Sequence, residues 1–396
     1  MSDRDQKTTL LRNARVVLPD KIATCAILIE EGRIAHILDS GAGESFKADA
    51  VINLDGLTLF PGFIDIHIHG AVGVDTNEAD ARSLKKVARF LAENGVTAWM
   101  PTLVPDSEEN YLRAIKAIDE LIRTQTEQEP AARSLGVHYE GPFVNEKQCG
   151  ALHTEFFKTF AARDELKSLP RLSAQDAAHL ITLAPEVEGG IELVKELVKQ
   201  NWIVSIGHTR ASIDVLDMAR EAGARHMTHF MNAMSPLHHR APGPVGWGLT
   251  NDTVSVDVIA DGVHVDPLVL KLVLRCKQVG RVSLISDSIA AAGLGDGRYE
   301  IWGETITVTN GRTENARGQI AGSVITMLDA ARRMLSLNVA ASDVARMAST
   351  NPARLLGIDK DCGSIEEGKR ADLVALDDDG QVRLTIIGGR IAFDSS

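Results

Sequence analysis

A regular alternation of short apolar segments and amphipathic helical segments fills the middle of the chain and limits the folds open to it. Repeated strand-then-helix units are typical of a parallel sheet. Eight such units favour a closed (β/α)8 barrel of the TIM type, with a doubly wound open sheet as the alternative. The strands are predicted at residues 63–69, 96–103, 135–140, 180–185, 202–208, 226–230, 254–261 and 282–287.

The helical segments between these strands carry recognisable end signals. Two of them stop at Gly95 and Gly223, and glycine is a usual residue just past a helix. The clearest helices are expected at residues 80–94, 188–200 and 211–222. After the eighth strand the pattern changes, and it predicts a β-hairpin insertion near residues 298–322 followed by helices at 324–337 and 342–350.

The two ends of the chain have a different texture, with short alternating strands and no helices between them. Strands are expected at residues 10–17, 26–30 and 33–37, and again at 371–376 and 382–387. Neither end alone supplies enough strands for a core. The sequence therefore predicts one small β-sandwich domain assembled from residues 1–60 and 361–396, with the barrel occupying residues 61–360.

Length and charge narrow the class of protein. A chain of 396 residues is long for a single domain, which fits one large and one small domain. A formal charge of -12 argues against nucleic acid or an anionic membrane as partner, because both need a basic surface. The first residues lack the apolar core of a signal peptide, and no segment is long enough to span a membrane. Four widely separated cysteines fit a reducing compartment, so a cytoplasmic location is expected.

The first predicted strand carries the motif His67-Ile68-His69. Alternate residues of a strand share a face, so Ile64, Ile66 and Ile68 are expected on the helix-covered surface and the two histidines on the opposite face. Two adjacent imidazoles at the carboxyl end of a barrel strand, where such barrels carry their catalytic residues, suit a divalent metal. A pair of surface histidines is the alternative interpretation.

Other predicted strands end in the same kinds of residue: Glu140, His208, His229 and Asp287. Imidazole nitrogens mixed with carboxylates suit Zn²⁺ or a similar borderline ion, with iron, cobalt or manganese as alternatives, better than Mg²⁺ or Ca²⁺. Such an ion lowers the pKa of a bound water from 15.7 toward about 7. Six candidate ligands exceed the need of one tetrahedral ion, so either two ions share Glu140 or one set is only partly used. Asp287 also fits a helix N-cap.

Five motifs in this order carry a family resemblance. They are His138-Tyr139-Glu140-Gly141-Pro142-Phe143, Gly207-His208-Thr209, the segment 228–234 (THFMNAM), the segment 259–264 (IADGVH) and Ser286-Asp287-Ser288. Together they resemble the amidohydrolase superfamily, and within it the N-acetylglucosamine-6-phosphate deacetylase family. The resemblance covers nearly the whole chain. It implies a homodimeric TIM barrel with a small β-sandwich domain that hydrolyses the N-acetyl group of a hexosamine 6-phosphate.

The resemblance also implies roles for single residues. Glu140, His208 and His229 match the main metal site of the family, and His67 and His69 match the pair found in members that can hold a second ion. Asp287 matches the catalytic acid–base, and His264 matches a residue that contacts the carbonyl side of the substrate.

The sugar-phosphate region of the family matches Asn232, Ala233 and Arg240. Ala241 stands where many relatives have an acidic residue, so the arrangement beside Arg240 is open. Cys149 and His153 lie in the loop after the third strand, at a position where the family often carries a Gly-Ala-His-like element. A lid that touches the substrate is one interpretation of this loop, and a cysteine without function is the other.

Three rivals remain at this stage. A cyclic-amide hydrolase of the same superfamily would need a carboxylated lysine on a barrel strand, and no lysine ends the fourth predicted strand. A relative without catalytic activity is the second rival. It would not need to keep every candidate ligand and Asp287, whereas this chain has all of them. An N-acetylgalactosamine-6-phosphate deacetylase differs by one sugar epimer, which the residues do not distinguish.

Overall fold

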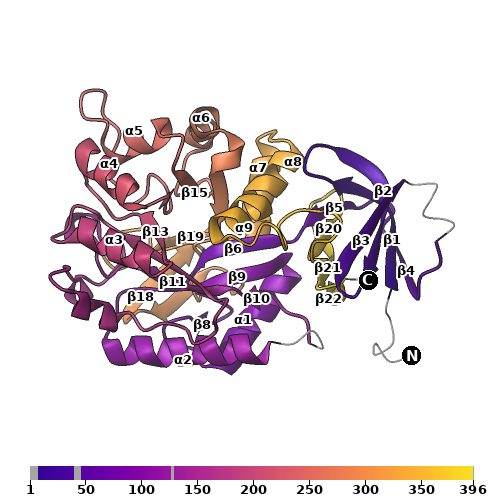
Figure 1. Cartoon of the computed structure of the whole chain (residues 1–396), viewed down its shortest axis with the longest axis horizontal. Helices are drawn as coiled ribbons and strands as arrows, with labels where there is room; N and C mark the ends of the chain where they lie inside the picture. Colours follow the sequence, from indigo (N-terminus) through magenta and orange to yellow (C-terminus); the bar gives the residue numbers. More distant parts are fainter. Residues whose placement is uncertain (1–7, 40–45, 126–128, 396) are drawn as a thin grey trace.

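The computed structural model describes residues 8–39, 46–125 and 129–395, and its main body is the predicted barrel (Figure 1). Each of the eight predicted segments forms a strand, and neighbours in the sequence pair in parallel around the ring. The strands are β6 (Phe63–Ile68), β9 (Val96–Leu103), β11 (Gly136–Glu140), β12 (Ala178–Leu183), β13 (Ile203–Ile206), β14 (His226–Met227), β15 (Ser255–Ile259) and β16 (Val282–Ile285), with the short β10 (Arg133–Ser134) beside β9.

Backbone hydrogen bonds just past the strands close the ring between β16 and β6. The N–H of Asp287 donates to the carbonyl of His67 at 2.9 Å, and the N–H groups of His69 and Gly70 donate to the carbonyl of Ser288. The predicted fold class is therefore confirmed, and the open sheet is excluded. The same bonds bring the last barrel strand against the His67–His69 motif.

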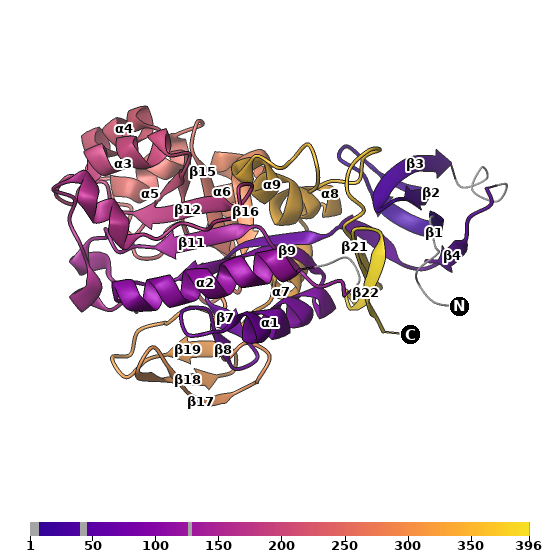
Figure 2. The ribbon, with the colours of Figure 1, turned by 60° about the horizontal axis from the view of Figure 1, so that its bottom comes forward.

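Helices cover the outside of the ring, as Figures 1 and 2 show. They are α1 (Ala81–Glu93), α2 (Glu108–Thr124), α3 (Gly190–Lys199), α4 (Ile213–Ala222), α5 (Gly243–Thr250), α6 (Pro267–Lys277) and α7 (Met327–Ser336). Asp80, Ser107 and Ser212 cap three of them by accepting a backbone N–H. The three helices that the sequence predicts most clearly are confirmed, and α4 ends as expected at Gly223, which has a positive φ of 113°.

One expectation about β6 is wrong. Ile68 packs in the main core between barrel and helices, but Ile64 and Ile66 belong to a separate cluster with Met100, Leu180, Ile203, Ile259 and Ile285. Side chains from six barrel strands can meet only inside the ring. The cause is an irregular register between β6 and β9, which breaks the strict alternation that the prediction assumed.

The two ends of the chain form one mixed sheet beside the barrel, at the right of Figure 1. Its order is β22-β21-β20-β5-β1-β2-β3, with β4 on the other half of the long β1. The strands are β1 (Thr8–Val17), β2 (Ile22–Glu30), β3 (Arg33–Asp39), β4 (Ala50–Asn53), β5 (Thr58–Pro61), β20 (Leu373–Leu376), β21 (Val382–Ile387) and β22 (Arg390–Asp394). Residues 1–7 and 40–45 of the expected small domain lie outside the described residues.

The insertion after β16 has three antiparallel strands rather than the two of a hairpin: β17 (Gly297–Ile301), β18 (Glu304–Thr309) and β19 (Arg312–Glu314). Figure 2 shows it beside the small pair β7 (Gly70–Ala71) and β8 (Val74–Asp75). The helix expected at 342–350 is α8 (Ala341–Ala345), which runs through a π-helical turn into α9 (Asn351–Leu356). Among the described helices, none has both the length and the apolar character needed to cross a bilayer.

Candidate metal centre and active site

The six side chains that the sequence places at the ends of barrel strands meet at one end of the ring. They come from β6, β11, the residues directly after β13 and β14, and the residues after β16: His67, His69, Glu140, His208, His229 and Asp287. All six residues are buried. The donor atoms of five of them, all but Asp287, form two groups that share Glu140.

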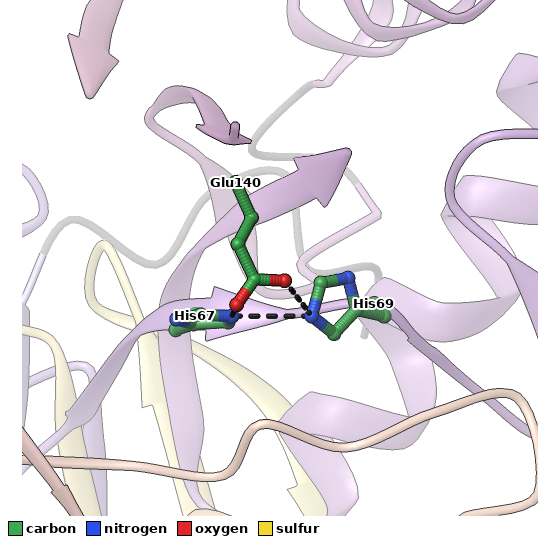
Figure 3. A group of neighbouring side chains, drawn as sticks. All are labelled: His67, His69 and Glu140. Atoms are coloured by element: carbon green, nitrogen blue, oxygen red, sulfur yellow. Dashed lines mark hydrogen bonds and ion pairs between the residues drawn. The ribbon is translucent and has the colours of Figure 1, made fainter. Parts of the chain in front are cut away.

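The first group joins the His67–His69 motif to Glu140 (Figure 3). The Nε2 atoms of His67 and His69 are 3.1 Å apart, and they lie 3.7 and 3.3 Å from the two Glu140 oxygens. Oδ1 of Asp287 is 3.3 Å from the Nε2 of His67 and 3.2 Å from the Nε2 of His69. Asp287 therefore lies directly against this group.

The second group is tighter and lies across the same carboxylate. Oε1 of Glu140 is 2.9 Å from the Nε2 of His208 and 2.8 Å from the Nε2 of His229. The two imidazole nitrogens are 3.1 Å apart. Glu140 is thus the residue through which the two groups touch.

The backbone turns sharply at three of these positions. His208, His229 and Asp287 have positive φ values of 46°, 31° and 51°, which side-chain-bearing residues seldom adopt. Each such residue costs on the order of 1–3 kcal/mol, so the surrounding structure must hold it there. The strain lies at the strand ends from which ligand-type side chains point inward.

Hydrogen bonds behind the second group hold the ring of His208 and the backbone of His229. Nδ1 of His208 donates to the carbonyl of Gln148 at 2.7 Å, which leaves its Nε2 free to face Glu140. The Asp257 carboxylate accepts the backbone N–H of His229 and also bonds to Nε2 of His226 at 2.8 Å. His226 is therefore a supporting residue of the barrel interior rather than part of either group.

His138 and Asp65 complete the supporting polar layer. Nδ1 of His138 donates to the carbonyl of Ile66 at 3.2 Å, so its Nε2 accepts from Thr182. Burial holds the pKa of His138 well below its usual range, which keeps the ring neutral. Asp65 accepts a 2.6 Å hydrogen bond from the Ser286 hydroxyl, one residue before Asp287.

The charges of the cluster favour a cation. Burial alone would lower the pKa of His69, but Asp287 and Glu140 outweigh it and raise that pKa to about 10. For His229 burial also opposes the shift, and Glu140 raises the pKa to about 9. Burial would raise the pKa of Glu140, yet the imidazoles of His67, His208 and His229 hold it well below its usual range.

This donor set fits a divalent metal. Four imidazole nitrogens and a carboxylate converge in a buried space, and imidazoles that close to one another are stable together only with a proton or a metal ion between the donor atoms. Nitrogen and oxygen ligands in this mixture suit Zn²⁺ and similar ions. Metal binding and protonation compete for the same atoms.

A cavity of about 320 Å³ opens above the cluster. It reaches His69, Glu140, His208, His229 and Asp287 at its floor. Its walls are Gly150, Ala151, Leu152, Asn232, Ala233, His264, Trp302, Gln319, Ile320 and Gly322. The ring of His264 is held by Asp261, whose Oδ2 accepts from Nδ1 at 2.7 Å, so Nε2 is the nitrogen left to the cavity.

Three residues that the sequence suggested for substrate binding do not line this cavity in the described chain. Arg240 is exposed, and its backbone N–H donates to Nδ1 of His238. His153 lies beside Glu155, with Nδ1 3.2 Å from the carboxylate, and Cys149 is part of the same loop. The neighbouring residues Gly150, Ala151 and Leu152 reach the cavity instead.

The part of the wall that the insertion contributes, namely Trp302, Gln319 and Ile320, was not predicted from the sequence. The insertion itself was predicted, but nothing in its residues says which way its turns point. Trp302-Gly303, a large aromatic before a turn glycine, was the one available signal.

Comparison with known proteins agrees with this geometry. The Amidohydrolase family model matches residues 58–392. The N-acetylglucosamine-6-phosphate deacetylase of Bacillus subtilis (strain 168) is 36% identical over 391 residues, which are 98% of both chains. The N-acetylgalactosamine-6-phosphate deacetylase of Escherichia coli O157:H7 is 38% identical over 346 residues, 87% of this chain and 90% of the other.

A solved structure gives the same result in three dimensions. A mutant N-acetyl-D-glucosamine-6-phosphate deacetylase from Mycobacterium smegmatis, in complex with N-acetyl-D-glucosamine-6-phosphate, superposes with a TM-score of 0.87 at 28% identity, covering 98% of this chain and 99% of that one. The chain therefore belongs to the amidohydrolase family.

Proposed function

We propose that this protein hydrolyses the N-acetyl group of N-acetylglucosamine 6-phosphate to give glucosamine 6-phosphate and acetate. The observation that carries the proposal is the pair of ligand groups sharing Glu140 beside Asp287, in a chain 36% identical along its length to a deacetylase of that substrate. The reaction belongs to amino-sugar catabolism and recycling. Relatives with this name occur in bacteria and vertebrates alike.

In this proposal Glu140, His208 and His229 hold one divalent ion, and His67 and His69 with the same Glu140 hold a second. Zinc is the preferred ion because of the nitrogen-rich donor set, and iron, cobalt or manganese would fit the same ligands. An ion bound there supplies Lewis acidity, which polarises the amide carbonyl and makes water acidic.

Asp287 is the proposed acid–base. Burial would raise its pKa, but the charges of His67 and His69 hold the pKa below its usual range, so the group is a carboxylate at neutral pH. It takes the proton of the attacking water and passes it to the sugar nitrogen, which leaves only once it is protonated. His264 presents Nε2 to the cavity from the far wall and is placed to contact the carbonyl side.

The sugar phosphate is assigned to the wall formed by Asn232 and Ala233, with Arg240 beyond it. Arg240 is exposed in the described chain, and its planar guanidinium suits a phosphate. In a homodimer in which the segment that carries Arg240 reaches the cavity of the neighbouring subunit, the exposed Arg240 would bind the phosphate there. The proposed location is the cytoplasm, since all four cysteines are free.

Assays of acetate release from N-acetylglucosamine 6-phosphate and N-acetylgalactosamine 6-phosphate, run side by side with defined metals, test the function. The second substrate is a specific alternative, because a relative that acts on it is 38% identical to this chain. The proposal expects higher kcat/KM for the glucosamine derivative. A higher kcat/KM for the galactosamine derivative would make N-acetylgalactosamine 6-phosphate the substrate instead. No acetate release from either sugar would reject the proposed function.

A further inference from the structure

Trp302 lines the cavity and contacts the metal-ligand cluster through His69. It occupies the two-residue turn between β17 and β18, with φ values of 54° at Trp302 and 71° at Gly303. Its ring meets the ring of His69 edge to face, with centroids 5.3 Å apart. The insertion therefore delivers one large apolar side chain onto a ligand of the first group.

Several contacts fix the indole in this position. It packs on the cluster of Val104, Val144 and Leu152 as well as on the insertion's own core. Its Nε1 is buried with no direct hydrogen bond among the described residues, and the same holds for Oδ2 of Asp75. Burial raises the pKa of Asp75 to about 6, and the nearby Trp302 side chain is among the groups that oppose this shift.

The insertion is also tied to the loop after β11. The guanidinium of Arg317 donates to the carbonyl of Ala151 at 3.3 Å and lies 3.4 Å from the Glu304 carboxylate. The loop residue Leu152 is buried and contacts the same cluster as Trp302. These contacts join the insertion and the loop after β11 into one part of the cavity wall, next to His69.

The cavity thus has two chemically different walls. Trp302 and Leu152, which pack in one cluster, and Ile320 give the insertion side a mainly apolar lining with Gln319 as its polar member, whereas Asn232 and His264 give a polar lining after β14 and β15. The acyl methyl group is the apolar part of an N-acetylhexosamine phosphate that lies nearest the reacting carbonyl. That methyl is one bond from the carbonyl carbon, which must lie within reach of Asp287 during hydrolysis.

We infer that Trp302, with Leu152 and Ile320, forms the acyl subsite and limits the size of the N-acyl group that this enzyme removes. The inference rests on the proposed function and adds the residue that sets its acyl specificity. His69 joins Trp302 to the proposed acid–base, since its Nε2 is 3.2 Å from Asp287 and its ring touches Trp302. A longer acyl chain would run directly into the indole.

The test compares kcat/KM for N-acetyl-, N-propionyl- and N-butyryl-glucosamine 6-phosphate. In a filled apolar pocket one methylene changes kcat/KM by about 10- to 200-fold, so the wild type should lose at least about tenfold at each added methylene. Trp302→Ala should restore at least about tenfold of the butyryl-to-acetyl ratio, and Trp302→Phe should restore much less. Tyr299→Ala is the matched control, because Tyr299 lies on the same insertion and bonds to Gly295 away from the cavity.

The ratio compares substrates on one preparation, so partial unfolding or metal loss does not change it. Should Trp302→Ala fail to fold, Leu152→Ala opens the same wall from the other segment and should shift the ratio in the same direction. Equal discrimination in the wild type and both variants would overturn the inference. No hydrolysis of any N-acylated substrate by the wild type would instead reject the proposed function.

Discussion

The two ligand groups that share Glu140 differ in spacing. Ligand atoms around a tetrahedral zinc with bonds of about 2.0–2.1 Å lie about 3.3 Å apart. The group of His67 and His69 has separations of 3.1, 3.3 and 3.7 Å, close to that value, whereas the group of His208 and His229 has 2.8, 2.9 and 3.1 Å. The second group is drawn together by hydrogen bonds to one carboxylate oxygen, and a bound ion would open it.

The groups also differ in what stands beside them. Asp287 lies within 3.3 Å of both histidines of the first group, and the first group is also the one that Trp302 covers. An ion in the first group would therefore lie directly beside the Asp287 carboxylate, whereas Asp287 reaches the second group only through its charge on His229. We therefore expect a change in the first group to affect Asp287 more directly than a change in the second group.

The largest effect is expected from Glu140→Gln. This change removes the carboxylate that both groups use, so both ions should be lost and turnover should fall to the background of the assay. His67→Asn and His208→Asn are matched controls, each of which should lower the metal content of only one group. Metal analysis of chelator-free protein measures this, and two retained ions in Glu140→Gln would contradict the shared-ligand arrangement.

Asp287→Asn should cut kcat by about 10²- to 10⁴-fold, because the amide side chain cannot accept and return a proton. Metal in the second group should stay near normal, since Asp287 does not touch it. Steady-state kinetics together with metal analysis separate the two effects. Near-wild-type turnover would remove Asp287 from its proposed role.

Arg240→Ala tests a residue outside both groups. If Arg240 binds the phosphate, its loss should raise KM for the phosphorylated sugar by about 10- to 100-fold and leave kcat nearly unchanged, as expected for one charged hydrogen-bonded contact. The metal content should not change. An unaltered preference for the phosphorylated over the unphosphorylated sugar would defeat the assignment.

The smallest effect concerns the stability of metal-free protein. The pKa values of His69 and His229, about 10 and about 9, are raised above the ordinary value near 6.5, so the folded state binds more protons than the unfolded state between these limits. The resulting stabilisation is complete below about pH 6.5 and is lost as pH rises through 9 to 10. The Tm of metal-free protein should fall over that range, and His69→Gln should remove the part at higher pH. A Tm that stays constant over this pH range would show that His69 and His229 do not hold extra protons in the folded state.

Much of the fold could be predicted from the sequence because apolar periodicity is a local property. Eight strands and the clearest helices fall where the pattern puts them. The prediction failed at Ile64 and Ile66, where an irregular register reversed two side chains, and no local pattern reports such an irregularity. The third strand of the insertion was also missed, because β19 has only three residues and so short a segment shows no clear alternation.

The candidate site also contains residues that could be predicted from the sequence and residues that could not. Residues at strand ends could be gathered from the sequence, because the barrel brings all carboxyl ends of its strands to one rim. The Trp302-Gly303 turn was a signal in the sequence, but the place of Trp302 in the cavity wall was not predicted, because it depends on packing against a loop far away in the chain. Arg240, also on a loop, lies outside the cavity of the described chain, and its predicted role still awaits the KM measurement.

The pairing of β5 with β20 has a consequence for how the molecule is made. β5 leads directly into β6, the strand that carries His67 and His69, yet one of its two sheet neighbours is synthesised only after the whole barrel. During translation the N-terminal half-sheet must wait with an open edge, exposed to wrong partners. Strands made after the barrel are therefore the ones that close the sheet edge next to the strand that carries His67 and His69.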